Sequence, residues 1–231
     1  MGTLTSLGED LFVVDGPTVR DLGIPFDTRM SIARLGDGAI WISSPVATSY
    51  AVLAAITALG PVRYLVSPTP RHYWRLARWH TLFPRAELWS SPITPVTLKD
   101  GDLPLTGLLG DPLPEAWTPD LEHVVLGDAL LRESVFYHAP SRTLLVEDVI
   151  QVHELLPGHP VSNAVFRLGG LMAPDGGVSR DIRLTFFDRR AAREAVRKIL
   201  DWPFRTVVLA HGPIVTRQAK AFVARAFDWL L

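Results

Sequence analysis

The sequence predicts an α/β protein in which two β-sheets pack face to face and helices cover both outer faces, a four-layer αββα sandwich. Three observations favour this class. Short β-like runs come in groups, helix-like stretches separate the groups, and each half of the chain begins as a strand meander and ends as helix, strand and helix. A doubly wound parallel sheet is the competing class, but meanders are antiparallel and no glycine-rich phosphate loop follows the first strand.

The first half begins with strands separated by turn residues such as Gly36-Asp37-Gly38. Aromatic and aliphatic residues spaced three or four apart predict a helix that Pro84 ends. Between residues 91 and 120, prolines and glycines predict an irregular segment with one short strand. The expected elements are strands at 11–14, 29–35 and 39–43, a helix at 49–59, a strand at 63–66, a helix at 73–83, and strands at 86–89 and 105–109.

The second half repeats this order around a loop-rich insert at 154–180, which we interpret as a lid or a partner-facing segment. Asp188 is the expected N-cap of a late helix, because its carboxylate can accept from the first free amides. The expected elements are strands at 121–126, 133–137 and 142–146, a short helix at 161–166, a helix at 189–200, a strand at 205–210 and a helix at 215–231.

Composition bounds the function. The 231 residues carry a formal charge of −1, contain no cysteine and are 48% hydrophobic. This length fits a single domain over residues 1–231. A near-zero net charge does not indicate the basic surface that binds nucleic acid. Because the sequence contains no cysteine, any metal must be held by His, Asp or Glu. We find no stretch able to span a membrane and no secretory signal, and therefore expect a cytoplasmic protein without a membrane partner.

Polar clusters follow three of the predicted strands. They are Ser67 to Tyr73, the pair Glu147-Asp148, and Ala210 to Gly212. Strands that end at ionisable residues can place His72, Asp148 and His211 around one point, where imidazole and carboxylate suit Zn, Mn or Fe(II). The alternative is that each residue caps a turn or bonds to the backbone by itself.

The same segments carry a resemblance. The order of elements, with 66–73, 145–148 and 209–212, resembles the metallo-β-lactamase fold, and in particular an uncharacterised branch known as a domain of unknown function. That branch shares the strand pair around Phe136-Tyr137-His138 and Arg142-Thr143-Leu144 and the late Ala210-His211-Gly212 turn. The resemblance covers nearly the whole chain and implies a metallo-β-lactamase-like sandwich.

The resemblance also implies a reduced metal site. Hydrolases of the fold carry a His-x-His-x-Asp-His run, and placing it here puts Pro68 and Pro70 at its first two histidines, His72 at its aspartate and Tyr73 at its last histidine. Proline cannot bind a metal. A further family histidine falls near Asp128, the later acidic residue matches Asp148, and the last histidine matches His211.

We therefore expect at most one divalent metal, Zn, Mn or Fe. The expected ligands are His72, Glu133, Asp148 and His211, and the expected substrate-binding residues are Arg71, Tyr73 and Asp128. Arg71 would hold an anionic group by a forked hydrogen bond. The site's catalytic residues stay unspecified.

Two functions fit these residues. The first is an atypical metal-dependent hydrolase of a small molecule that is not a β-lactamase, and the second is a metal-free, inactive binding or scaffold protein of the same fold. An iron oxidoreductase would use the same ligands, but nothing in the chain selects it. The seven tryptophans are more than an ordinary core needs and raise the expectation of a homodimer contact.

Overall fold

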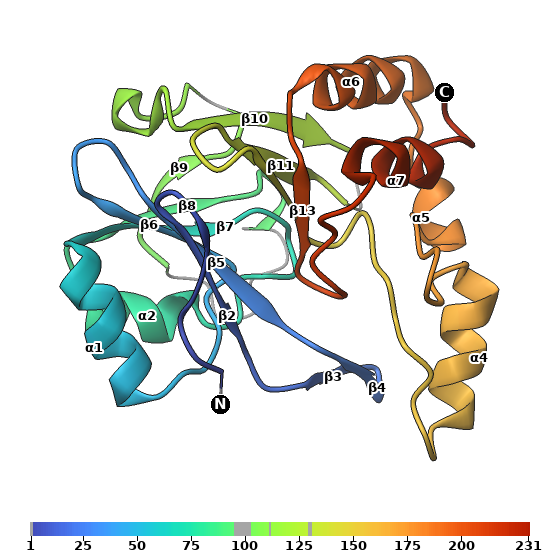
Figure 1. Cartoon of the computed structure of the whole chain (residues 1–231), viewed down its shortest axis with the longest axis horizontal. Coiled ribbons are helices and arrows are strands. Elements are labelled where there is room, and N and C mark those ends of the chain that lie inside the picture. The colour runs from blue at the N-terminus through green and yellow to red at the C-terminus, as the bar shows by residue number, and fades with distance from the viewer. Residues whose placement is uncertain (1, 95–102, 111, 129–130) are drawn as a thin grey trace.

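The computed structural model describes residues 2–94, 103–110, 112–128 and 131–231. Two sheets face each other with helices on both outer sides (Figure 1). The seven-stranded sheet has the order β1 (Thr5–Gly8), β2 (Leu11–Asp15), β5 (Arg29–Arg34), β6 (Ile40–Ser43), β7 (Val62–Ser67), β8 (Glu87–Ser90) and β9 (Leu105–Leu108). The four-stranded sheet has the order β10 (Leu121–Leu126), β11 (Glu133–His138), β12 (Thr143–Val146) and β13 (Thr206–Leu209).

The helices lie outside the sheets, and a small hairpin projects from one edge. The hairpin pairs β3 (Val19–Asp21) with β4 (Ile24–Phe26). The helical elements are α1 (Tyr50–Leu59), α2 (Leu76–Leu82), the 3₁₀ turn η1 (Glu115–Trp117), α4 (Pro160–Gly169), α5 (Arg180–Arg183), α6 (Arg189–Asp201) and α7 (Ala219–Ala226). Among the described residues, no helix combines the length and the apolar character needed to cross a bilayer.

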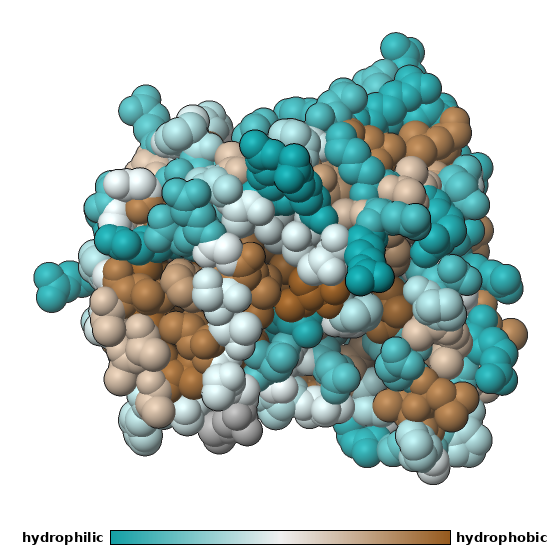
Figure 2. All heavy atoms as spheres, in the orientation of Figure 1, coloured by the Kyte–Doolittle hydropathy of each residue, from teal (hydrophilic) through white to brown (hydrophobic). Residues whose placement is uncertain are grey.

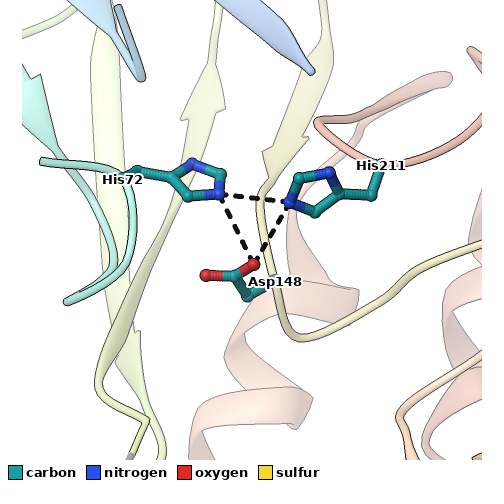
Figure 3. A group of neighbouring side chains, drawn as sticks. All are labelled: His72, Asp148 and His211. Atoms are coloured by element: carbon teal, nitrogen blue, oxygen red, sulfur yellow. Dashed lines mark hydrogen bonds and ion pairs between the residues drawn. The ribbon is translucent and has the colours of Figure 1, made fainter. Parts of the chain in front are cut away.

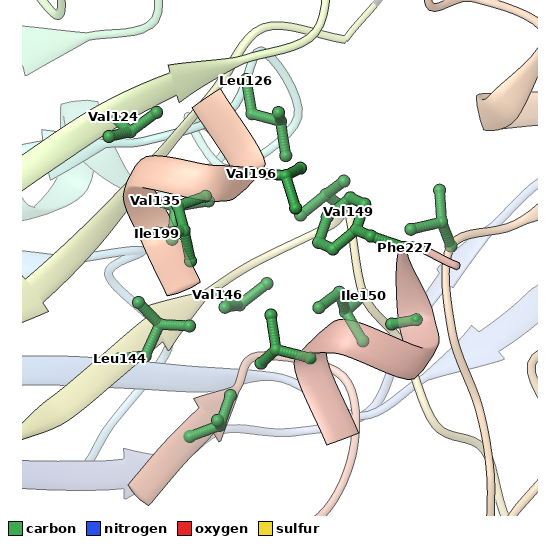
Figure 4. Packing of buried hydrophobic residues seen from close by; sticks show 14 of the residues in the cluster. Val124, Leu126, Val135, Leu144, Val146, Val149, Ile150, Val196, Ile199 and Phe227 are labelled. Carbon is green, nitrogen blue, oxygen red and sulfur yellow. The ribbon is translucent and has the colours of Figure 1, made fainter. Parts of the chain in front are cut away.

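Three hydrophobic clusters fill the three interfaces between the four layers. The first lies between the seven-stranded sheet and α1 with α2, where Leu65 packs near Ile56 and Trp79. The second lies between the sheets and includes Trp41, Leu145 and Val208. The third lies between the four-stranded sheet and α6 with α7 (Figure 4). This arrangement confirms the predicted αββα sandwich.

Aromatic rings form much of the cluster between the two sheets. Trp41 of β6 meets Phe136 of β11 with ring centroids 5.0 Å apart, and Trp117 with centroids 5.9 Å apart, both edge to face. Edge-to-face contact is favourable because the positive edge of one ring meets the negative face of the other. These contacts fix the spacing of the sheets and therefore of the loops at their edges.

Parallel strand pairs bring the polar clusters to one edge of the sandwich. β6 pairs with β7 in parallel, and β12 pairs with β13 in parallel, so the carboxyl ends of each pair lie at the same edge of their sheet. The amide of Ser134 donates to the carbonyl of Pro68 at 2.9 Å, which ties the loop after β7 to the other sheet. Residues that follow these strands can therefore meet.

Several element boundaries differ from the sequence prediction. The helix expected at 73–83 begins only at Leu76, because the preceding residues form turns, and the last helix covers Ala219–Ala226 because Val215 pairs with Val207 in a short bridge. The hairpin of β3 and β4, the edge strand β1 and the short helix α5 were not predicted. Part of the irregular segment, residues 95–102 and 111, lies outside the described residues.

Candidate metal centre

Three side chains from three different loops converge at the edge of the sandwich. His72 lies in the loop after β7, Asp148 follows β12, and His211 follows β13 (Figure 3). His72 Nε2 lies 3.2 Å from His211 Nε2 and 3.4 Å from Asp148 Oδ1, and His211 Nε2 lies 3.3 Å from that same oxygen. These residues form the one group of potential metal ligands within the described part of the chain.

The spacing of the three ligand atoms fits a metal ion. Two atoms bound at about 2.0–2.1 Å to one tetrahedral ion lie about 3.3–3.4 Å apart, whereas neighbouring ligands of an octahedral ion at the same distance lie about 2.9–3.0 Å apart. The observed 3.2, 3.3 and 3.4 Å therefore fit one face of a tetrahedron better. A fourth position would then stay open, as it does in catalytic zinc sites.

The other ring nitrogen of each histidine has a partner that fixes its orientation. His211 Nδ1 lies 2.6 Å from the carbonyl oxygen of Asp27, and we assign the proton to this nitrogen because a carbonyl can only accept. His72 Nδ1 lies 3.2 Å from Glu147 Oε2 and 2.7 Å from Ser44 Oγ. Protons on both Nδ1 atoms leave the Nε2 lone pairs facing Asp148, as in histidine–metal sites.

Hydroxyl groups hold the acidic members of the site. Thr69 donates its hydroxyl to Asp148 Oδ2 at 2.5 Å, while Ser43 donates to Glu147 Oε1 at 2.7 Å. Asp148 and Glu147 are 5% and 4% exposed. Because each carboxylate has one oxygen engaged by a hydroxyl group, the other oxygen keeps a defined direction toward the histidines.

Electrostatics couples the three residues strongly. Burial alone would lower the pKa of His72, but the Asp148 and Glu147 carboxylates outweigh it and raise that pKa well above its ordinary value. Burial alone would raise the pKa of Asp148, yet His72 and His211 hold it well below its usual range. A shared positive charge, as a proton or as a metal ion, is therefore what this group of atoms requires.

Glu133, which was expected to be a metal ligand, instead binds the main chain of the loop that carries Asp148. Its carboxylate accepts the backbone amides of Glu147, Asp148 and Val149 at 2.7–2.8 Å. Burial and the neighbouring Asp148 raise the pKa of Glu133 to about 8 despite these hydrogen bonds. Since its oxygens are engaged by the main chain, Glu133 shapes the loop that presents Asp148 and is not part of the ligand group.

The expected substrate-binding residues lie at different places. Arg71 lines the cavity above the site and pairs with Asp21 Oδ2 at 3.6 Å. Tyr73 instead packs against the cluster beside α1 and α2. Asp128 does not line the cavity, and its carboxylate accepts the amides of Phe187 and Asp188 at 2.7 and 3.0 Å. Of the three, Arg71 alone lines the cavity over the ligands.

Sequence reasoning missed most of the residues that orient the ligands. Ser43 and Ser44 were not among the expected site residues, but the hydroxyl group of Ser43 contacts Glu147 and that of Ser44 contacts His72. Glu147 is adjacent in sequence to a predicted ligand, and Thr69 lies within a predicted polar cluster, so the sequence could have indicated that both belong to the site. The Asp27 carbonyl carries none, because a backbone acceptor has no sequence signature.

A cavity of about 510 Å³ lies over the three ligands. Its walls come from the β3–β4 hairpin, the segment after β6, the loop after β7, and α4 with α5. The insert expected at 154–180 therefore contributes one wall. Volumes of roughly 300–1,000 Å³ are usual for small-molecule sites.

Comparison with solved structures places the fold among the metallo-β-lactamases. The DIM-1 metallo-β-lactamase exposed to ceftazidime matches with a TM-score of 0.65 at 13% identity, covering 99% of this chain and 97% of that chain. A metallo-β-lactamase from Erythrobacter litoralis gives a TM-score of 0.62 at 15% identity, covering 98% and 92%. The metal-soaked flavodiiron core Flv1 from Synechocystis sp. PCC6803 gives 0.64 at 13%, covering 99% and 60%.

The sequence itself matches one family model. Residues 20–162 match the family described as Domain of unknown function (DUF4336), and the chain belongs to this family. Among curated proteins no sequence match is found. The protein is thus a DUF4336 member with the metallo-β-lactamase fold, which confirms the resemblance noted from its sequence.

Proposed function

We propose that this protein is a metal-dependent hydrolase that uses one divalent ion, held by His72, Asp148 and His211. The main support is the convergence of two Nε2 atoms and one carboxylate oxygen, with both Nδ1 atoms already engaged. Two lone pairs and a carboxylate facing one point repel each other unless a proton or a metal ion lies between them, and a metal ion can engage all three atoms at once. Zn, Mn and Fe(II) all accept this ligand set, and the tetrahedral spacing favours Zn.

A bound ion would lower the pKa of a coordinated water and polarise a substrate oxygen. Residues of the protein orient the proposed ligands and form the cavity that would hold the substrate. Ser44 and Glu147 orient His72, the Asp27 carbonyl orients His211, and Thr69 orients Asp148. The cavity over the ligands limits access by bulk water and positions the substrate.

The ligand set argues against β-lactamase activity of the two-metal kind. Pro68 and Pro70 stand where the resemblance places two histidines, and neither can coordinate. Both are buried in the loop after β7. The described residues contain a single group of ligands, so the proposed site holds one ion.

Hydrolysis by the metal-loaded full chain tests the proposal. The chain would be stripped with a chelator, reloaded with Zn, Mn or Fe(II), and assayed on a panel of chromogenic esters and phosphoesters. We expect turnover that a chelator removes and metal restores, and that Asp148→Asn reduces by at least about 100-fold. Asp228→Asn, which changes an exposed carboxylate just after α7, is the matched control.

The competing function is a metal-free binding protein on the same fold. Pro68 and Pro70 are the residues that motivate it. If no tested metal binds and small-molecule ligands stabilise the chain equally with and without chelator, the binding function is supported and the hydrolase is excluded. If chelation lowers the melting temperature of the purified chain, the hydrolase is supported, because a bound ion stabilises the folded state.

A further inference from the structure

The cavity over the ligands has largely apolar walls. The hairpin contributes Val19 and Phe26, and the segment after β6 contributes Val46. From the opposite side, Val165 and Leu168 of α4 face the same space. A ligand that fills it must therefore have an aliphatic or aromatic body.

Several polar side chains in this wall already have partners. Arg71 pairs with Asp21 across the rim, and Ser179 donates its hydroxyl to Asp181. Arg29 uses its guanidinium on Asp15 and on the carbonyls of Leu209 and Gly212. A sugar or nucleotide carries many hydroxyl and amide groups, and burying them without partners is costly. The other two arginines of the lining, Arg75 and Arg180, are exposed to solvent and can meet a polar end of a ligand, whereas the partnered side chains disfavour a ligand that is polar throughout.

Apolar side chains are exposed where the cavity meets solvent. Trp74 is 55% exposed, Val165 is 43% exposed and Leu168 is 70% exposed, and all three line the cavity. Apolar side chains gather on the surface in the region of α4 (Figure 2). Exposed apolar side chains that gather on a surface mark an interaction surface or a ligand-binding groove, and the cavity that these three residues line favours the groove.

We propose that the substrate is an ester of an aliphatic acid, with the acyl chain lying between α4 and the β3–β4 hairpin. This inference rests on the proposed hydrolase function. The ester carbonyl would lie at the ion, and water would add to that carbon while the ester bond breaks to give the acid and the alcohol. A cavity of about 510 Å³ lies within the range of roughly 300–1,000 Å³ that small-molecule sites have, which leaves room for an acyl chain together with the ester group.

Binding of aliphatic alcohols tests whether the cavity accepts an apolar ligand, and it does not require catalysis. Titration calorimetry of 1-butanol, 1-hexanol and 1-octanol on the metal-stripped full chain measures the contribution of the aliphatic part alone. Each added methylene should tighten binding by about three- to fourfold, or on the order of 100-fold from butanol to octanol. An affinity that does not change with chain length would overturn the assignment.

Two glutamate variants on the helix α4 test where the aliphatic part of the ligand binds. Val165→Glu places a charge in the cavity wall and should weaken 1-octanol binding at least tenfold. Val161→Glu lies one turn earlier, is 73% exposed and faces a separate depression beside Leu22, so it should leave binding unchanged. Both sites are open to solvent, so neither variant should disturb folding. Equal weakening by both variants would refute the proposed position.

Ester hydrolysis by the metal-loaded chain separates the two proposals. We expect kcat/KM for p-nitrophenyl octanoate to exceed that for p-nitrophenyl butanoate by at least tenfold, and Val165→Glu to remove the preference. Chain-dependent binding of alcohols without any hydrolysis would refute the hydrolase and leave the aliphatic cavity supported. Hydrolysis with no dependence on chain length in either assay would refute the aliphatic cavity and leave the hydrolase supported.

Discussion

Replacing Glu147 by glutamine should weaken metal binding although Glu147 is not one of the three ligands. One of its oxygens accepts from Ser43 and the other lies 3.2 Å from His72 Nδ1. A glutamine has one oxygen and one NH₂ group at these two places. Its oxygen can face either the Ser43 hydroxyl or the His72 N–H, so either Ser43 loses its acceptor or His72 loses its charged acceptor and keeps only the neutral Ser44 hydroxyl.

The size of the effect follows from the lost hydrogen bond. A hydrogen bond to a charged group contributes about 1.5–3 kcal/mol, and about 1.4 kcal/mol corresponds to a factor of ten. Glu147→Gln should therefore raise the dissociation constant for Zn²⁺ by about 10- to 100-fold, which agrees with the usual effect of removing a carboxylate that orients a metal-bound histidine.

Competition with a chromophoric chelator measures this dissociation constant. Glu9→Gln removes an exposed carboxylate near the start of the chain and serves as the control, with an expected change below twofold. Ser44→Ala should have a smaller effect than Glu147→Gln, since it removes a neutral partner of the same nitrogen. An unchanged zinc affinity in Glu147→Gln would refute our account of how His72 is oriented.

Three further predictions concern stability, each measured by urea denaturation. Burial lowers the pKa of His138 to about 4, so its neutral form favours folding above about pH 6.5 and that contribution is lost as the pH falls toward 4. From pH 7 to 5, wild type should lose about 2 kcal/mol more unfolding free energy than His138→Phe, and equal losses would contradict this. Asp188 accepts the amides of Arg190 and Ala191, so Asp188→Ala should cost about 1 kcal/mol, and no loss would show that the cap is unimportant. Ile199→Ala opens the cluster below α6 and should cost about 2–5 kcal/mol, whereas a loss below 1 kcal/mol would mean that this interface is loosely packed.

The layered architecture could be predicted from the sequence because the spacing of hydrophobic residues reflects which faces of the strands and helices are buried. The strands β6 and β12 are mostly apolar and buried along their whole length, as expected for strands covered on both faces. The helix α6 shows a polar face and an apolar face, with Asp188 at its start. The hairpin of β3 and β4 escaped detection because it is two three-residue strands that are only partly buried.

The convergence of His72, Asp148 and His211 could be predicted from the sequence in part. His72, Asp148 and His211 each follow a buried strand, and parallel pairing brings such positions to one edge. Glu133 was expected to add a carboxylate to the ligand group, but its orientation toward the amides of 147–149 depends on the turn after β12. Sequence position cannot separate a carboxylate that binds an ion from one that binds the main chain.

The metal content of the purified full chain tests the central claim most directly. Elemental analysis after loading with Zn, Mn or Fe(II) and removal of free ions should give about one ion per chain for the wild type. The variant combining His211→Ala with Asp148→Ala should retain none, provided that circular dichroism shows it folded. A wild type that holds no ion after all three loadings, or a double variant that holds as much as the wild type, would contradict the one-metal site.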